Sequence, residues 1–344
     1  MRVRPRNSRP AGGPCRLGLA GGLLVAAACG GGTVPLPDLE PTAAEDRREI
    51  LARGEYIVRS VAVCGHCHAA EPQTDPGGPL AGGMAFDDWR LGTIRASNLT
   101  PDSATGIGAW TEPEIVRALR TGEGRDGALL APVMPYAWFH GMSDRDALAV
   151  ARYLLSQPAI RHQVESEPNL VFELASALFL RPLDPPDSAI APPHGPTASY
   201  GSYLANHVAL CADCHTPRGG IRNQPDRSRL FAGQSDPPSG FPANPANLTP
   251  DSATGIGRWT EADFLRALRS GIDADGDSLH PFMPWRQFRR MGDDDLRAIY
   301  RYLRTLPPIR NRVPHADHAG GAVHDTSHAE RRPPPQEGPA RPRA

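Results

Sequence analysis

The chain of 344 residues contains a long internal duplication. Residues 98–111 read Asn-Leu-Thr-Pro-Asp-Ser-Ala-Thr-Gly-Ile-Gly-Ala-Trp-Thr, and residues 247–260 repeat them with Arg258 in place of Ala109. Other landmarks follow at nearly the same offset; Tyr153 and Tyr302, for example, lie 149 positions apart. A repeat period this long indicates two copies of one domain rather than a solenoid of short units.

Both copies have the pattern of a helical domain with long loops. Residues 45–63 show helical periodicity in their apolar positions. Thr111 and Glu114 form a capping box that predicts a short helix ending before Gly122, and Ser143 predicts the start of a last helix. The second copy repeats this order, and neither copy shows runs of alternating strand pattern. The predicted fold class is therefore all-α.

The same patterns give the domain boundaries. We predict a signal peptide over 1–29, a tether over 30–44, a first domain over 45–158, a Pro-rich linker over 159–198, a second domain over 199–313 and a disordered tail over 314–344. The apolar stretch 170–180 in the linker is either a short helix packed between the domains or a linker anchor. Four histidines of the tail allow either a metal site or a solvated segment: His315, His318, His324 and His328.

The N-terminal segment has the pattern of an export signal. Five arginines precede an apolar run over residues 17–28, which is too short for a permanent membrane span. The run ends in Ala-Ala-Ala-Cys29 and resembles a bacterial lipoprotein signal, in which Cys29 becomes the lipidated first residue. The alternative is ordinary cleavage after Ala28, which leaves Cys29 as a free thiol. The lipidated form predicts a periplasmic protein anchored to a membrane through its lipid.

The overall charge gives no sign of nucleic-acid binding, and the composition indicates a bound cofactor. The formal net charge is −1 and no block of like charge stands out, so nothing suggests binding to nucleic acid. Aromatic residues make up only 6% of the chain. Part of the core is therefore expected to be a bound cofactor.

A Cys-x-x-Cys-His motif stands at matching positions in the two copies. The motifs consist of Cys64, Cys67 and His68 in the first copy, and of Cys211, Cys214 and His215 in the second. This is the attachment pattern of c-type haem: the two thiols form thioethers to the vinyl groups, and the His ligates the iron. We therefore predict two covalently bound haem c groups. A redox pair of cysteines, or one zinc site built from both pairs, does not require a His after each second Cys.

Methionines supply the predicted sixth ligand of each iron. Met134 and Met283 occupy matching Pro-x-Met-Pro loops, and a thioether is a soft donor that favours ferrous iron. Met142 and Met291 also match, but they precede a helix cap, where an apolar residue usually packs as a staple. Met84 has no counterpart. Two histidines are minor candidates for the same position: His140 and His280.

Three further features of the repeats have alternative or structural interpretations. His66 cannot bend back to its own iron and is expected to be exposed. Trp110 and Trp259 either donate an indole N–H to a haem propionate or belong to a turn before the next helix. Four tyrosines are expected to bring the first and last helices of each domain together: Tyr56 with Tyr153, and Tyr203 with Tyr302.

Taken together, these motifs identify a family. Each half resembles a class I cytochrome c domain, so the resemblance implies two tandem cytochrome c domains with loops wrapped around the haem. The sequence around the Gly-Ile-Gly-x-Trp and Met-Pro motifs resembles that of the cytochrome c subunits of bacterial membrane-bound alcohol, aldehyde and gluconate dehydrogenases. The resemblance covers roughly residues 45–312. Those subunits commonly have three haem domains. The resemblance implies redox partners such as a membrane-bound dehydrogenase or a terminal oxidase.

The leading hypothesis is transfer of single electrons between redox partners, in the periplasm or at the membrane surface, with no catalytic residues. A di-haem cytochrome c peroxidase is the enzyme alternative, and it needs an open or displaceable position on one iron with acid and base groups above it. A haem-based ligand sensor is a third possibility. Binding of carbon monoxide to the reduced protein, or turnover of peroxide, would distinguish these functions.

Overall fold

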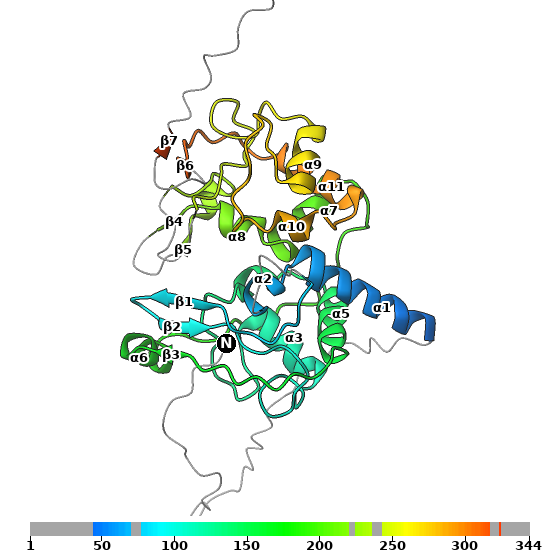
Figure 1. The fold of residues 1–344 in the computed structure, drawn as a ribbon, viewed down its shortest axis with the longest axis vertical. Helices are drawn as coiled ribbons and strands as arrows, with labels where there is room; N and C mark the ends of the chain where they lie inside the picture. The colour runs from blue at the N-terminus through cyan, green and yellow to red at the C-terminus, as the bar shows by residue number, and fades with distance from the viewer. Residues whose placement is uncertain (1–43, 70–76, 220–223, 236–242, 317–322, 325–344) are drawn as a thin grey trace, which may run out of the picture.

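The computed structural model describes residues 44–69, 77–219, 224–235, 243–316 and 323–324. Figure 1 shows the two repeats as two lobes, one built from the elements α1 to α5 and the other from α7 to α11. The predicted signal peptide, Cys29 and the tether up to residue 43 lie outside the described residues. Within the described part of the chain, no helix has the length and apolar character needed to cross a membrane.

The first repeat consists of short helices, two strands and long loops. Its elements are α1 (Ala44–Tyr56), the π-helical turn η1 (Ile57–Val61), α2 (Gly65–His68), β1 (Ala85–Asp88), β2 (Gly92–Arg95), α3 (Glu112–Thr121), α4 (Tyr136–Phe139) and α5 (Asp144–Leu155). The predicted first helix over 45–63 is therefore an α-helix that ends in a π turn.

The second repeat has the same order of helices. Its elements are α7 (Ala198–Tyr203), the π-helical turn η2 (Leu204–Val208), α8 (Cys211–His215), β4 (Arg218–Gly219), β5 (Gln224–Pro225), the 3₁₀ turn η3 (Arg227–Arg229), α9 (Glu261–Ser270), α10 (Trp285–Phe288) and α11 (Asp293–Leu303). Between the repeats lie β3 (Glu167–Pro168) and α6 (Leu170–Leu178), and β6 (His315–Ala316) and β7 (Val323–His324) follow α11.

The short helix in the middle of each repeat starts and ends where its sequence predicts. Thr111 and Glu114 exchange side-chain and backbone hydrogen bonds at the start of α3, and Thr260 does the same with Asp263 at α9. Gly122 ends α3 with a φ of 76°. A left-handed residue at this position satisfies the last carbonyls of the helix, and glycine adopts it without steric cost. Both capping boxes are thus confirmed.

The first and last helices of each repeat cross at very close range. α1 packs against α5, and α7 packs against α11. A side chain on Gly54 would lie 2.1 Å from the carbonyl oxygen of Ala149, and one on Gly201 would lie 1.9 Å from that of Ala298. Only glycine therefore allows the two backbones to approach in this way. The two repeats share this crossing at matching positions.

Short sheets accompany the helices, so the expectation of an all-α fold holds only in part. β1, β2 and β3 form an antiparallel sheet in which Phe86 pairs with Ile94, and β4 pairs with β5. β6 pairs with β7 through His315 and His324, and the other predicted tail histidines, His318 and His328, lie outside the described residues. These strands have two to four residues. Loop segments of this length can satisfy their backbone groups by pairing without an alternating side-chain pattern.

One hydrophobic cluster runs through both repeats. It includes Ile57 and Val61 of η1, Leu204 and Val208 of η2, and Leu303 of α11, all of them fully buried. The two repeats therefore share a continuous apolar core and do not pack as two separate cores.

The segment between the repeats lies on the first repeat. The helix α6 occupies most of the apolar stretch predicted as a helix or anchor, and its Phe172 packs on Ile94 and Ala131. Farther along, the backbone N–H of Leu183 donates to the carbonyl of Thr121. Most of the predicted linker thus packs along the first repeat, and its last residues reach the second, where His194 contacts Asp295.

Candidate functional site

Both Cys-x-x-Cys-His motifs open into one cavity of about 2300 Å³. Its wall contains Cys64, Cys67 and His68 from the first repeat and Cys211, Cys214 and His215 from the second. Met134 and Met283 lie on the same wall. The structure therefore brings together all eight residues that the sequence predicts as haem ligands.

A strained turn directs each motif into the cavity. Val63 and Leu210, which immediately precede the first Cys of each motif, have φ values of 43° and 58°. Residues with a side chain rarely adopt this left-handed region, and a β-branched Val is especially unfavourable there. Each follows a π turn, an irregularity that occurs frequently at functional sites. No sequence signal predicts this turn, because both residues are poor choices for it.

None of the four motif cysteines is paired in a disulfide. Burial raises the pKa of Cys64 to about 11 and that of Cys211 to about 12. A redox-active Cys pair shows the opposite behaviour, because its attacking thiol needs a lowered pKa. Among the residues that the structure describes, no three His, Cys, Asp or Glu side chains are grouped to hold a metal ion. The arrangement therefore fits neither the redox pair nor the zinc site.

The two motif histidines are held in the same orientation. Nδ1 of His68 donates to the carbonyl of Ser97, and Nδ1 of His215 donates to that of Ala246, both at 2.7 Å. This bond fixes the tautomer and leaves Nε2 as the free ligand atom. Burial lowers the pKa of His68 to about 4, so its imidazole stays neutral. Burial also lowers the pKa of His215.

The two pairs of matched methionines have different surroundings. Met134 and Met283 are half-buried and line the cavity. Their loops are held by backbone bonds, because the N–H of Tyr136 donates to the carbonyl of Met134, and Trp285 repeats this contact in the second loop. Met142 and Met291 are instead almost completely buried in the core cluster, as expected for packing residues, although Met291 also reaches the cavity wall and Met142 does not.

The remaining candidates for the sixth position differ in their contacts. Nδ1 of His140 lies 3.0 Å from the carbonyl of Arg120, away from the cavity wall. His280 lines the cavity, but its Nδ1 accepts a hydrogen bond from the backbone of Phe282. Met84 is also outside the lining residues. Axial ligation by Met134 and Met283 stays a prediction, supported by their position on the wall.

The prediction that His66 is exposed is wrong. Its ring packs edge-on against Phe282 of the second repeat, with ring centroids 4.8 Å apart, and burial lowers its pKa to about 4. The motif of one repeat therefore contacts the methionine loop of the other. Sequence reasoning treated each repeat alone and could not place this neighbour.

The duplicated segment after Asn98 has a structural role that the sequence did not reveal. The Asn98 side chain donates to the carbonyl of Ile160 at 2.8 Å and accepts from the backbone and hydroxyl of Thr100. Asn247 makes the same bonds to Ile309 and Thr249. Each Asn thus ties the cavity loop to the chain that follows the last helix. The near-identity of the two segments was the signal for this role.

The tryptophans that follow this segment line the cavity. Trp110 and Trp259 both belong to the wall, together with the first glycine and the isoleucine of the preceding Gly-Ile-Gly turn. Their backbone N–H groups donate to Ile107 and Ile256. The turn before the next helix is therefore present, and donation of an indole N–H to a haem propionate stays a prediction.

Known proteins show similarity to most of the chain. Residues 200–307 match the cytochrome c family. The gluconate 2-dehydrogenase cytochrome c subunit of Pantoea cypripedii is 31% identical over 80% of this chain and 63% of its own length. The cytochrome c subunit of a quinone alcohol dehydrogenase of Gluconobacter oxydans is 32% identical over 77% of this chain and 57% of its own length. A diheme cytochrome c-type protein of Cereibacter sphaeroides is 28% identical over 75% of this chain and 86% of its own length.

This chain spans about three fifths of the length of the first two of these relatives. The matched region 200–307 includes the second attachment motif and the Met283 loop. The site and the comparisons agree on the chemistry of this region. Residues 200–307 belong to the cytochrome c family, and the chain is a homologue of cytochrome c subunits and diheme cytochromes.

Proposed function

We propose that the chain is an electron-transfer protein made of two tandem cytochrome c domains, each holding one covalent haem c. One observation carries this proposal. Each repeat places a Cys-x-x-Cys-His motif and a Met on the wall of the same cavity, with the His oriented by a backbone carbonyl. The matching geometry in the two repeats supports two haem sites with the same ligand set.

Each haem site has the same division of roles. The two cysteines hold the porphyrin by thioethers, and the His and Met are the axial ligands of the iron: Cys64, Cys67, His68 and Met134 in the first repeat, Cys211, Cys214, His215 and Met283 in the second. The bound haem supplies a one-electron couple. The protein surrounds it with a wall of apolar and polar side chains and a fixed, neutral imidazole, which are features that tune the potential.

Electron transfer needs no open coordination position. A peroxidase needs one iron with an open or displaceable ligand, together with acid and base groups. Met134 and Met283 occupy the same place in the two repeats, so the geometry favours closure of both irons. The relatives described above are named as cytochrome c subunits and a diheme cytochrome. The peroxidase alternative therefore has no support.

The test is the composition and ligation of the mature protein. Mass spectrometry is expected to find two covalent haem groups per chain. The reduced protein is expected not to bind carbon monoxide. Met134→Ala should open one iron and allow one carbon monoxide to bind per chain, whereas the matched change Met142→Ala should not. A mature protein without covalent porphyrin would contradict the proposal.

The names of the relatives suggest a redox partner for the chain. Two of them are named as subunits of gluconate and alcohol dehydrogenases. We propose that the chain accepts electrons from a dehydrogenase and passes them to an acceptor such as a terminal oxidase. Purification from the native membrane should recover a dehydrogenase with this chain, and recovery of the chain alone under mild conditions would contradict a stable complex.

The location is proposed from the leader sequence. A lipidated Cys29 would hold an exported chain at the membrane surface through its acyl groups. Replacing Cys29 with Ser should move the protein from the membrane fraction to the soluble periplasmic fraction. The intact mass of the mature N-terminus distinguishes lipidation from ordinary cleavage.

A further inference from the structure

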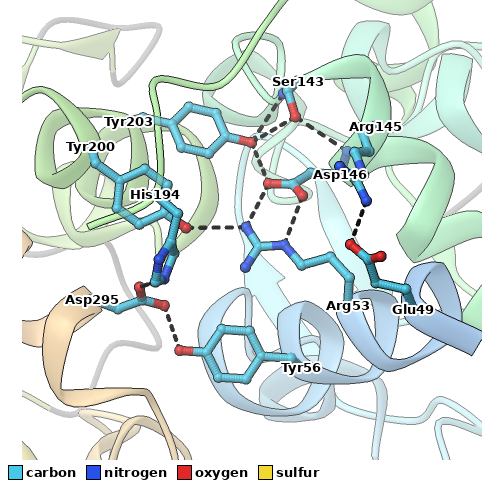
Figure 2. A network of polar contacts seen from close by, with 10 residues as sticks. All are labelled: Glu49, Arg53, Tyr56, Ser143, Arg145, Asp146, His194, Tyr200, Tyr203 and Asp295. Atoms are coloured by element: carbon cyan, nitrogen blue, oxygen red, sulfur yellow. Dashed lines mark hydrogen bonds and ion pairs between the residues drawn. The ribbon is translucent and has the colours of Figure 1, made fainter. Parts of the chain in front are cut away.

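The two repeats are joined by tyrosines that cross from one to the other. Tyr56, the last residue of α1, donates to Oδ2 of Asp295 at 2.5 Å and accepts from the backbone N–H of Gly292 at 2.8 Å. Tyr203, the last residue of α7, donates to Oδ2 of Asp146 at 2.7 Å and accepts from the N–H of Ser143 at 3.1 Å. Figure 2 shows both crossings in one network. We call these two sets of bonds the tyrosine crossings.

The crossings correct the expected role of these tyrosines. Tyr56 and Tyr203 were expected to join helices within one repeat, and their hydroxyl groups instead bond to the other repeat. The tyrosines of the last helices do act within a repeat, since Tyr153 accepts from Arg59 and Tyr302 accepts from Asn206.

The two crossings are related by a pseudo-two-fold symmetry. Tyr56 and Tyr203 are equivalent in the duplication, as are Asp146 and Asp295. Each tyrosine reaches the first turn of the other repeat's last helix. Tyr56 of the first repeat bonds to Asp295 of the second, and the equivalent Tyr203 of the second repeat bonds to Asp146 of the first. The same rule holds at the level of elements, because α4 contacts η2 and α10 contacts η1. This is the geometry of an isologous dimer interface within one chain.

The acceptors of the crossings are buried carboxylates. The side chain of Asp146 is 6% exposed and that of Asp295 is 2% exposed. A buried carboxylate needs hydrogen-bond donors, and losing one leaves an unsatisfied group. Burial, together with the nearby Asp295 charge, raises the pKa of Tyr56. Burial and the Asp146 charge raise the pKa of Tyr203 in the same way. Both hydroxyls therefore stay protonated and remain donors.

Each crossing lies a short distance along the chain from an attachment motif. Tyr56 precedes Cys64 by eight residues, and Tyr203 precedes Cys211 by eight residues. Only a π turn, its C-terminal alanine and the left-handed residue separate each tyrosine from the first Cys of its motif. A shift of α1 or α7 relative to the other repeat is therefore transmitted directly to the cysteines and the His of the motif.

Further contacts between the repeats form beside the cavity. The ring of His66 packs on Phe282, which lines the cavity beside Met283. On the other side, the guanidinium of Arg227 lies 4.9 Å from the centre of the Trp138 ring, and Nδ1 of His207 lies 3.0 Å from the Trp138 carbonyl. The wall around the two motifs is thus built jointly by the two repeats.

We propose that Tyr56 and Tyr203 are positioning residues that hold the two attachment motifs in one mutual orientation across the shared cavity. On this view, which rests on the proposed function, the two haems act as a coupled pair that exchanges electrons within the chain. The hydrogen bonds of the crossings are made to Asp146, Ser143, Asp295 and Gly292 and not to the predicted haem ligands. They act through α1 with η1 and through α7 with η2.

The test removes the two hydroxyls and measures the mutual orientation of the haems. Tyr56→Phe, Tyr203→Phe and the double variant are compared with Tyr153→Phe, which removes a buried tyrosine hydroxyl that bonds within one repeat. Two haems held in a fixed orientation give a bisignate circular dichroism signal in the Soret region. We expect each single variant to lose part of this signal and the double variant to lose most of it, while Tyr153→Phe keeps it.

A second measurement separates this inference from the proposed function. Haem content per chain is measured by mass spectrometry on every variant. Two haems with an unchanged Soret signal in the double variant would overturn the inference and leave the proposed function intact. Fewer than two haems in the wild-type chain would overturn the proposed function. If the double variant does not fold, the two single variants decide, since an unchanged signal in both would contradict the inference.

Electron distribution provides an independent readout. Wild-type protein that receives less than one electron per chain in a fast photoreduction pulse is expected to redistribute it between the haems in a concentration-independent phase. The variants that lose the Soret signal should show a slower phase of this kind. A phase with the wild-type rate in the double variant would contradict a positioning role.

Discussion

The two buried carboxylates at the tyrosine crossings, Asp146 and Asp295, occupy equivalent positions in the repeats but contact different side chains. In the first repeat, Arg53 forms two bonds of 2.8 Å to Asp146. In the second repeat, Tyr200 stands where Arg53 stands in the first, and Nε2 of His194 contacts Asp295 at 3.0 Å. Figure 2 shows that Tyr200 now bonds to Arg53 across the interface. The first carboxylate is paired with a permanently charged guanidinium, and the second contacts the imidazole of a histidine.

The parts that hold the attachment motifs have not diverged in this way. His68 and His215 bond to backbone carbonyls at the same distance. Asn98 and Asn247 make the same set of bonds. The comparison teaches that the duplicated chain kept the geometry around the motifs and kept the crossings, whereas charge compensation at the crossings changed in one repeat.

The largest expected effect is the loss of the permanent cation. Arg53→Met keeps the apolar stem and leaves Asp146 buried without its ion pair. Burial opposes the charge of Arg53, but the hydrogen bond and charge attraction to Asp146, together with the contacts to Tyr200, outweigh burial and raise the pKa of Arg53. We expect the free energy of unfolding to fall by about 3–5 kcal/mol, as for a broken buried ion pair. Urea unfolding followed by circular dichroism measures it.

The matched control is a surface ion pair from the same network. Arg145 bonds to Glu49, and both side chains are 66% exposed. Arg145→Met should cost less than about 1 kcal/mol, because exposed pairs are screened by solvent. Equal losses in the free energy of unfolding from Arg53→Met and Arg145→Met would contradict the prediction that burial of Asp146 makes its ion pair the more important one.

The sequence predicts those elements whose causes lie within a few residues. The capping boxes at Thr111 and Thr260 and the helix stops at Gly122 and Gly271 depend on local hydrogen bonds and backbone conformation, and the structure has them as predicted. The attachment motifs are recognised for the same reason, because their chemistry is contained in five consecutive residues.

The crossings could not be predicted, because a duplicated sequence does not tell contacts within a repeat from contacts between repeats. Tyr56 meets a matching Asp in either arrangement, and only the three-dimensional structure shows that it is Asp295. The short strands were missed because backbone pairing of two to four residues leaves no side-chain period. The bond from Asn98 to Ile160 was missed because its acceptor is a carbonyl 62 residues away.

The second prediction concerns the feature that the two repeats share. Asn98→Ala should leave the N–H of Thr100 without its acceptor and remove one donor from the carbonyl of Ile160, which keeps the Thr100 hydroxyl, and Asn247→Ala should do the same in the second repeat. Because both asparagines are buried, each change is expected to cost about 2–3 kcal/mol in the free energy of unfolding. Urea unfolding of both variants measures whether the costs are equal.

The exposed serine of the same segment serves as the control. Ser103→Ala should change the free energy of unfolding by less than about 0.5 kcal/mol, as for an ordinary surface position. The losses in the free energy of unfolding from Asn98→Ala and Asn247→Ala should be equal. A difference as large as that between Arg53→Met and His194→Ala would show that the asparagine contacts differ between the repeats as much as the partners of Asp146 and Asp295 do.

A smaller effect is expected at His194, the partner of Asp295 in the second repeat. The His194 side chain is 64% exposed, so its contact with Asp295 is open to solvent. His194→Ala should therefore cost less than about 1 kcal/mol at neutral pH. The same unfolding measurement, made beside Arg53→Met, compares the two counter-charges directly. A loss from His194→Ala as large as that from Arg53→Met would remove the contrast between the two repeats.

The smallest effect is a pH dependence that the two repeats should share. The hydroxyl and backbone N–H of Thr105 bond to Asp102 and lower its pKa below the ordinary value of 3.8, and Thr254 lowers the pKa of Asp251 in the same way. Because these carboxyls bind protons less readily in the folded chain, the unfolded chain is protonated first as the pH falls. Their contribution to stability is complete above the ordinary pKa and is lost as the pH falls through the lowered value.

Replacing each carboxyl tests this pH dependence. Asp102→Asn and Asp251→Asn should each remove a small part of the acid sensitivity below pH ~4 and leave the shape of the stability curve at neutral pH unchanged. Unfolding curves collected from pH ~2 to ~7 measure it. Since the two turns have the same bonds, the two variants should behave alike, and a clear difference between them would place part of the divergence of the repeats in the cavity loops.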